Sequence, residues 1–158
     1  MEILIIFKSM IETTRQLYDV NQTGEQMSRL VLTYWTDLGA WLNRPFSEFY
    51  RYVCNLPYIP DPPGVETVSR PGYTINPGYA PRDCDDKAVL IASWLHGNGH
   101  KCRFVASSTK PNRQLHHVFV QLDDGTLIDA TYSQNAQFLG SYPYFAKLTK
   151  IIPLTRFF

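Results

Sequence analysis

The chain has 158 residues, the length of one domain, and 44% of them are hydrophobic while 18% are charged. This composition excludes an extensively disordered chain, and the formal net charge of +1 excludes a global attraction to nucleic acid or to an acidic membrane. We therefore expect a single domain over residues 1–158 that recognises its partner through a local site.

Targeting and redox features of the sequence favour a cytoplasmic protein. The apolar run from Met1 to Phe7 lacks a basic leader and a small-residue cleavage site, and no stretch is long enough to span a membrane. Cys54, Cys84 and Cys102 form neither an even-numbered disulfide framework nor a CxxC pair, which argues against structural zinc. We expect a cytoplasmic location, with association with a virion as the alternative.

Two helices are predicted in the first third of the chain. Thr23 and Gln26 have the spacing of a capping box for the first helix. Apolar residues then recur at helical spacing, at Met27, Leu30, Val31, Tyr34, Leu38, Trp41 and Leu42. Pro45 suits the first position of the second helix, which should end near Asn55. Its apolar stripe comprises Phe46, Phe49, Tyr50 and Val53.

A long irregular segment is predicted from residue 57 to residue 81. It contains seven of the eleven prolines and has no helical periodicity, so extended chain and turns are expected at the surface. Apolar patterning resumes on both sides, which indicates a loop within one domain. Such a loop is either a plain connection or a segment that faces a substrate.

The second half of the chain is predicted to place a helix before a group of strands. The helix should begin near Cys84 and stop at Gly97 or Gly99. A strand is expected over 102–106, and strands over 116–122 and 126–132 should form a hairpin around Asp123-Asp124-Gly125. The remainder, to residue 158, has a strand-forming composition without a clear placement.

The register of this hairpin decides which of two histidines lies on the same sheet face as Asp129. If the loop has three residues, Asp129 faces Phe119 and shares a face with His117. If the loop has two residues, Asp129 faces Val120 and shares a face with His116. Both registers are compatible with the sequence.

Cys84 is the candidate nucleophile. Asp83 can cap the helix and leave the thiol in the first turn, where amide groups and the helix dipole lower a thiol pKa from about 8.5 and can later bind an oxyanion. Asp83, Asp85 and Asp86 would oppose this effect if they pointed inward, and we expect them to point toward solvent or to cap the helix. Taken alone, Cys84 is more typical of a small buried core residue.

A cysteine nucleophile needs an imidazole base and a third group that orients the imidazole. His117 and Asp129 on the two strands of the hairpin supply these groups, and His116 is the alternative base. Each residue alone is more typical of an ordinary strand position. The combination with a cysteine at a helix start predicts a Cys-His-Asp centre.

Several motifs together resemble the transglutaminase-like superfamily. Residues 82–90 and 99–105 are similar to its catalytic helix and the strand that follows, and residues 117–120 and 127–131 to its histidine and aspartate strands. Residues 58–66 resemble the run before the cysteine in a subgroup common in bacteria and bacteriophages. The resemblance covers residues 46–132, and the motifs occur in the family's order.

The resemblance implies a papain-like α+β fold, in which N-terminal helices and a cysteine-bearing helix pack on an antiparallel sheet. It assigns Cys84 as nucleophile, His117 as base in preference to His116, and Asp129 as orienter. Cys102 stands where the family often has a small residue, and we expect it to be buried and inert. The doubled histidine also departs from the family pattern.

By this resemblance the protein is a thiol-dependent hydrolase, a cysteine peptidase or amidase that cleaves amide bonds of a protein or peptide through a thioester. The alternatives are transglutaminase-type acyl transfer to an amine, and a non-catalytic phage or virion module that binds an assembly partner. No metal or other cofactor is expected, because no EF-hand loop or comparable carboxylate array is evident. No nucleic-acid or membrane partner is expected.

Overall fold

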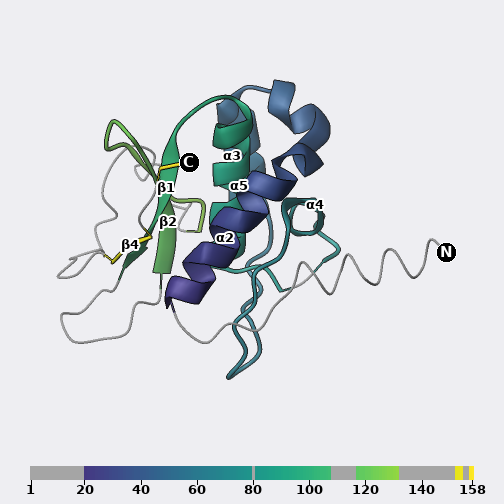
Figure 1. The fold of residues 1–158 in the computed structure, drawn as a ribbon. Helices are drawn as coiled ribbons and strands as arrows, with labels where there is room; N and C mark the ends of the chain where they lie inside the picture. The colour runs from purple at the N-terminus through teal and green to yellow at the C-terminus, as the bar shows by residue number, and fades with distance from the viewer. Residues whose placement is uncertain (1–19, 80, 108–116, 132–151, 155–156) are drawn as a thin grey trace.

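The computed structural model describes residues 20–79, 81–107, 117–131, 152–154 and 157–158. The helices are α2 (Val20–Tyr34), the 3-10 helix η1 (Trp35–Asn43), α3 (Phe46–Asn55), α4 (Pro71–Thr74) and α5 (Cys84–Gly97). The strands are β1 (Cys102–Ser107), β2 (His117–Leu122), β3 (Leu127–Ile128) and β4 (Ile152–Leu154). Helices precede an antiparallel sheet with strand order β3-β2-β1-β4, so this part of the chain is α+β (Figure 1).

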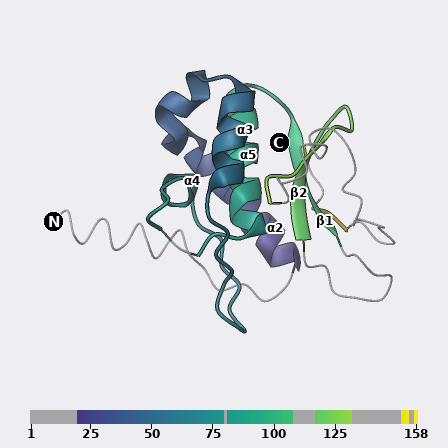
Figure 2. The ribbon, with the colours of Figure 1, turned by 180° about the vertical axis from the view of Figure 1, so that it is seen from behind.

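Helix α5 lies at the centre of the fold. Every residue from Asp85 to Leu95 is buried, as expected of a helix enclosed on all sides. It packs against α2, η1, α3 and α4 as well as against β1 and β2. The two opposite views show α2 and α3 on opposite sides of α5, with the sheet beside it (Figures 1 and 2). Helix α5, whose first residue is Cys84, therefore contacts both the other helices and the sheet.

The close packing around α5 depends on Gly97 at its last position. A β-carbon there would lie 2.7 Å from a ring carbon of Trp35 and 2.8 Å from a methyl group of Leu42. Because real β-carbons do not approach other atoms so closely, only glycine lets η1 pack against the end of α5.

The hairpin between β2 and β3 has a three-residue loop. The Leu122 amide donates to the Thr126 carbonyl at 2.8 Å, and Gly125 has a φ of +93°. The ladder pairs Val120 with Ile128, so continuation of the register puts Asp129 opposite Phe119. Of the two registers compatible with the sequence, the structure has the one in which Asp129 and His117 share a face.

The first predicted helix differs from the observed one at both ends. Helix α2 begins at Val20, so the prediction of a capping box at Thr23 is wrong. Met27, Leu30 and Val31 are fully buried, which confirms the apolar stripe. The prediction of one helix to Leu42 is wrong, because the chain leaves helical geometry at Tyr34, with φ and ψ of −124° and 12°, and again inside η1 at Gly39, with φ and ψ of 52° and −123°.

The second predicted helix is close to the observed one. Pro45 is the N-cap of α3 and not its first helical residue, and the helix ends at Asn55 as predicted. The predicted helix from Cys84 to Gly97 and the strand from Cys102 are also confirmed.

Arg82 holds the segment 57–81 against the rest of the protein. The prediction of extended chain and turns at the surface is wrong for part of this segment, because it contains α4 and its Val68 is fully buried. The Arg82 side chain is fully buried, and its guanidinium donates to four main-chain carbonyls. These belong to Thr74 at 2.9 Å, Asn76 at 2.6 Å, Tyr79 at 2.8 Å and Pro57 at 3.1 Å. Main-chain hydrogen bonds of 2.7 Å also link Arg82 to Ile59 in both directions. The segment is thus anchored two residues before Cys84.

The C-terminal end of the chain returns to the sheet. Strand β4 pairs with β1, and the Phe158 amide donates to the Cys102 carbonyl at 3.1 Å. Cys102 is fully buried as predicted, and burial raises its pKa to about 12. Residues 132–151, which include most of the unplaced tail, lie outside the described residues. Within the described ranges, no helix combines the length and apolar character needed to cross a membrane.

Candidate active site

Cys84 is the first residue of α5, as predicted. Asp83 is the N-cap, and Asp83 and Asp86 form a reciprocal capping box in which the Asp83 amide donates to the Asp86 carboxylate at 3.2 Å. The cap ends the extended chain that leads from Arg82 and starts the helix at the cysteine. The thiol is therefore fixed at the N-terminal end of the central helix, where main-chain amides have no helical partner.

His117 and Asp129 form a buried hydrogen-bonded pair. His117 is the first residue of β2, and its Nε2 atom lies 2.5 Å from the Oδ2 atom of Asp129. A carboxylate only accepts, so the Nε2–H group donates. The second carboxylate oxygen accepts from the Thr131 amide at 2.9 Å. Both oxygens of Asp129 thus have a partner, and the imidazole is held in one orientation.

The sulfur of Cys84 meets the histidine strand at the residue after His117. The main chain of Val118 lies close enough to the thiol sulfur to favour the thiolate, and the charge of Asp129 acts on the same sulfur in the opposite direction. Cys84 remains partly exposed and is not sealed in the core. The structure thus brings together the three stretches that carry Cys84, His117 and Asp129. His116, the alternative base, lies outside the described residues.

The thiol pKa is raised, which contradicts the prediction that the helix N-terminus lowers it. Burial is the largest cause and the charge of Asp83 is the second, and together they raise the pKa of Cys84 to about 12. The main chain of Val118 favours the thiolate, but the charges of Asp129 and Glu66 oppose it. In the unliganded protein the neutral thiol is therefore the resting form at neutral pH.

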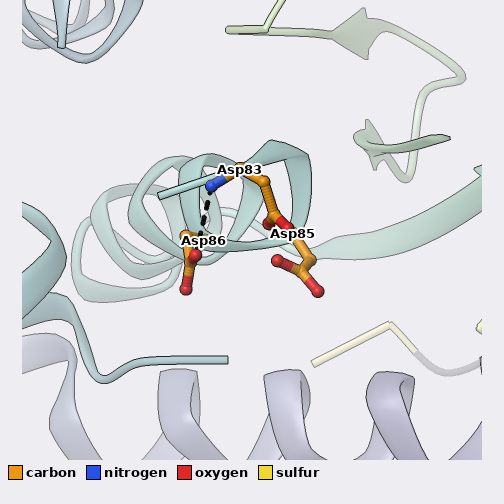
Figure 3. A group of neighbouring side chains, drawn as sticks. All are labelled: Asp83, Asp85 and Asp86. Carbon is orange, nitrogen blue, oxygen red and sulfur yellow. Dashed lines mark hydrogen bonds between the residues drawn. The ribbon is translucent and has the colours of Figure 1, made fainter. Parts of the chain in front are cut away.

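The three aspartates around Cys84 gather into a buried acidic cluster, formed by Asp83, Asp85 and Asp86. Their exposed fractions are 9%, 3% and 0%, so none of the three points toward solvent, and the expectation that each would face solvent or cap the helix is wrong for Asp85. Asp83 and Asp86 do cap the helix, as the dashed line in Figure 3 shows. The fold buries them because α5 is enclosed on all sides, a tertiary effect that local sequence does not reveal.

Oxygen atoms of this acidic cluster lie within 4.8 Å of one another (Figure 3). The Oδ1 atoms of Asp83 and Asp85 are buried and have no hydrogen-bond partner among the described residues. Carboxylate oxygens are the donors that hard cations such as Ca²⁺ and Mg²⁺ prefer, so these three residues could hold a cation. The sequence analysis did not foresee this grouping of three buried carboxyl groups.

Within the described residues no salt bridge reaches the acidic cluster, and the charge of Arg82 acts on Asp86 without a direct ion pair. Burial and the surrounding negative charges raise the pKa values of Asp85 and Asp86 well above the ordinary range. Arg82 donates to carbonyls, and the Lys87 ammonium donates to the Cys54 carbonyl at 3.2 Å. Glu66 contacts Asp85, and burial raises the pKa of Glu66 as well. Asp85 and Asp86 therefore reduce the local repulsion by retaining protons more readily than ordinary carboxyl groups.

Two residues that contact Asp129 were missed by the sequence analysis. The Tyr50 hydroxyl donates to the Asp129 carbonyl at 2.7 Å, although the sequence suggested only an apolar stripe residue of a helix. Thr131 contributes its main-chain amide, which any residue type other than proline would offer. No local pattern identifies the Tyr50 contact, because Tyr50 lies 79 residues before Asp129, whereas the Thr131 contact is a local bond from two residues further along the chain.

The chain was also compared with models of protein families, with known proteins and with solved structures. None of them matches. The likeness to the transglutaminase-like superfamily therefore stays a sequence-based prediction. The function of the site is inferred from its residues and their geometry.

Proposed function

We propose that the protein is a thiol-dependent hydrolase that cleaves amide bonds, with Cys84 as nucleophile, His117 as base and Asp129 as orienter. The proposal includes a papain-like arrangement in which the cysteine helix packs on an antiparallel sheet. The observation that carries it is the buried hydrogen bond between His117 and Asp129, next to the main chain of Val118, which lies close to the Cys84 sulfur. A protein or peptide is the proposed substrate class.

Proton transfer accompanies the attack of Cys84 in this mechanism. With a thiol pKa of about 12, the thiolate is not formed in advance at neutral pH. The Nε2 atom of His117 is bonded to Asp129, so Nδ1 is the atom that takes the thiol proton. Asp129 stabilises the imidazolium while the sulfur forms a bond to the carbonyl carbon.

The remaining steps return the enzyme to its starting state. The Cys84 amide, in the first turn of α5, donates to the oxyanion of the tetrahedral intermediate. His117 gives its proton to the departing amine as the carbon–nitrogen bond breaks, which leaves a thioester on Cys84. Water then attacks the thioester, with His117 taking a proton from the water and returning it to the sulfur.

A second candidate is a non-catalytic module that retains the fold, which the thiol pKa of about 12 favours. Burial and the neighbouring Asp83 make Cys84 a poor nucleophile unless His117 accepts its proton. In this alternative the site is part of the protein's core and the surface binds an assembly partner.

Incubation with a peptide library, followed by mass spectrometry, tests the proposal. The wild type and the Cys84→Ala variant are compared with and without an added primary amine. Cleaved peptides that depend on Cys84 support the hydrolase, and amine incorporation at glutamine would instead indicate a transferase. Identical product spectra from wild type and Cys84→Ala would reject both activities and support the non-catalytic module.

A further inference from the structure

Tyr50 reaches from helix α3 to the main chain of Asp129. Its hydroxyl group donates to the Asp129 carbonyl oxygen at 2.7 Å, across 79 residues of sequence. Strand β3 ends at Ile128, so the ladder pairing that orders the strand stops one residue before Asp129. The Tyr50 hydroxyl supplies a tertiary hydrogen bond at the point where the regular strand ends.

Asp129 is thereby held at three atoms. His117 bonds its Oδ2 atom at 2.5 Å, the Thr131 amide bonds its Oδ1 atom at 2.9 Å, and Tyr50 bonds its main-chain oxygen. The first two contacts set the plane of the carboxylate. Only the third ties the Asp129 backbone to a different layer of the fold, the helix α3.

Tyr50 is itself well placed to hold a fixed position. The ring of Tyr50 contacts Phe46 with the ring centres 5.9 Å apart, and the ammonium group of Lys87 in α5 donates to the Cys54 carbonyl in α3 at 3.2 Å. Burial raises the pKa of the Tyr50 hydroxyl, so it remains a donor over the whole pH range in which a thiol enzyme works. Helix α3 therefore connects the cysteine helix to Asp129.

We propose that Tyr50 is a positioning residue, which acts through Asp129 to hold the His117 imidazole in place for Cys84. This inference rests on the proposed function for its catalytic consequence, whereas its geometric part concerns only the His117–Asp129 pair. A displaced orienter would misplace the base, and reactions that depend on alignment lose rate steeply with small displacements.

The chain offers a matched control on the same helix. The Tyr52 hydroxyl donates to the Ile75 carbonyl at 2.9 Å, another tertiary contact from α3 to a distant main-chain oxygen. Tyr52→Phe and Tyr50→Phe therefore each remove one hydroxyl and one such hydrogen bond, and only Tyr50 bonds Asp129. If the two variants have similar melting temperatures, any other difference between them comes from the position of the lost hydroxyl group and not from a general loss of stability.

Two measurements on these variants test the inference. The first is the NMR signal of the His117 Nε2–H proton, which the hydrogen bond to a buried carboxylate moves downfield. We expect Tyr50→Phe to shift this signal and Tyr52→Phe to leave it unchanged. The second is the alkylation rate of Cys84 by iodoacetamide at pH 7, which should fall about tenfold in Tyr50→Phe and stay at the wild-type value in Tyr52→Phe.

The outcomes separate this inference from the proposed function. An unchanged His117 signal in Tyr50→Phe would overturn the positioning role, whatever the alkylation rates. A shifted signal supports it, and in the Asp129→Asn background Tyr50→Phe should then cause no further loss of alkylation rate. If His117→Ala alkylates as fast as the wild type while Tyr50→Phe still shifts the signal, the proposed function fails and the positioning of the pair stands.

Discussion

The Nε2 atom of His117 and the Oδ2 atom of Asp129 lie 2.5 Å apart, and each side chain is only 2% exposed. Because a carboxylate accepts the Nε2 proton, the pair selects one tautomer of the neutral imidazole. Any catalysis by Cys84 through His117 therefore depends on Asp129.

Asp129→Asn should lower the alkylation rate of Cys84 at pH 7 by about 100-fold, because the neutral amide no longer stabilises the imidazolium. Mass spectrometry of iodoacetamide-treated protein measures this rate. Asp123→Asn, in the exposed hairpin loop, is the control and should react like the wild type. An Asp129→Asn rate equal to that of the control would contradict the orienting role.

Asp83→Asn should lower the pKa of Cys84. Asp83 is the largest electrostatic cause of the raised thiol pKa, and asparagine caps a helix about as well as aspartate. At pH 9 the thiolate fraction rises about tenfold for each unit by which the pKa falls, so alkylation should become faster. The thiolate absorbance over a pH titration measures the pKa directly. An unchanged titration would show that the Asp83 charge does not reach the sulfur.

The acidic cluster should make the protein less stable as the pH rises. The folded-state pKa values of Asp85 and Asp86 lie above their unfolded values, so the folded protein binds more protons. Their contribution is fully present below the unfolded pKa of about 4 and is lost as the pH rises through the folded pKa. For each carboxyl group the loss is about 1.4 kcal/mol per pH unit between these two pKa values. Urea unfolding at several pH values measures this trend, and a stability that rises steadily between pH 4 and pH 8 would contradict it.

Two substitutions in the acidic cluster should have opposite effects at pH 8. Asp85→Asn replaces a buried carboxyl group whose Oδ1 atom has no hydrogen-bond partner among the described residues, and we expect it to stabilise the protein. Asp86→Asn should destabilise it by about 1–3 kcal/mol. The reason is that both Asp86 oxygens accept main-chain hydrogen bonds, from Ser69 at 2.9 Å and Asp83 at 3.2 Å. Equal changes in the free energy of unfolding for the two substitutions would show that the Asp86 hydrogen bonds do not determine the effect.

Arg82→Lys should lower the free energy of unfolding by about 2–4 kcal/mol, because an ammonium group cannot replace a buried guanidinium that donates to four carbonyls. Arg44→Lys is the control, since Arg44 forms an exposed ion pair with Glu48 at 3.6 Å and should change stability by about 0.5 kcal/mol or less. Equal losses for the two variants would contradict the anchoring role of Arg82.

The sequence predicts the fold well where one local signal dominates. Helix α5 has a capping aspartate before Cys84 and glycines after its last turn, and both of its ends agree with the prediction. For helix α2 the local signal is misleading. The apparent capping box at Thr23 lies inside the helix, which begins at Val20. The hairpin register needed the structure, because two loop lengths suit Asp123-Asp124-Gly125 equally well.

The residues of the proposed site could be named from the sequence, whereas their electrostatics could not. Cys84 and Asp129 follow from residue types on a helix start and on a strand, and the family resemblance was needed to choose His117 over His116. The thiol pKa does not follow from the sequence, because burial of α5 by the other helices and the sheet raises it and carries Asp83 and Asp85 inward with the cysteine. Contacts from distant elements, such as that of Tyr50, likewise exist only after the chain has folded.

The central claim is that His117 accepts the proton of Cys84, and the alkylation rate of Cys84 tests it most directly. Iodoacetamide labelling between pH 6 and pH 9 is followed by mass spectrometry in wild type and in His117→Ala, with Cys54 and Cys102 as internal references. We predict that His117→Ala slows Cys84 by about 100-fold near neutral pH and leaves the other two thiols unchanged. Equal Cys84 rates in the two proteins across this range would contradict the claim.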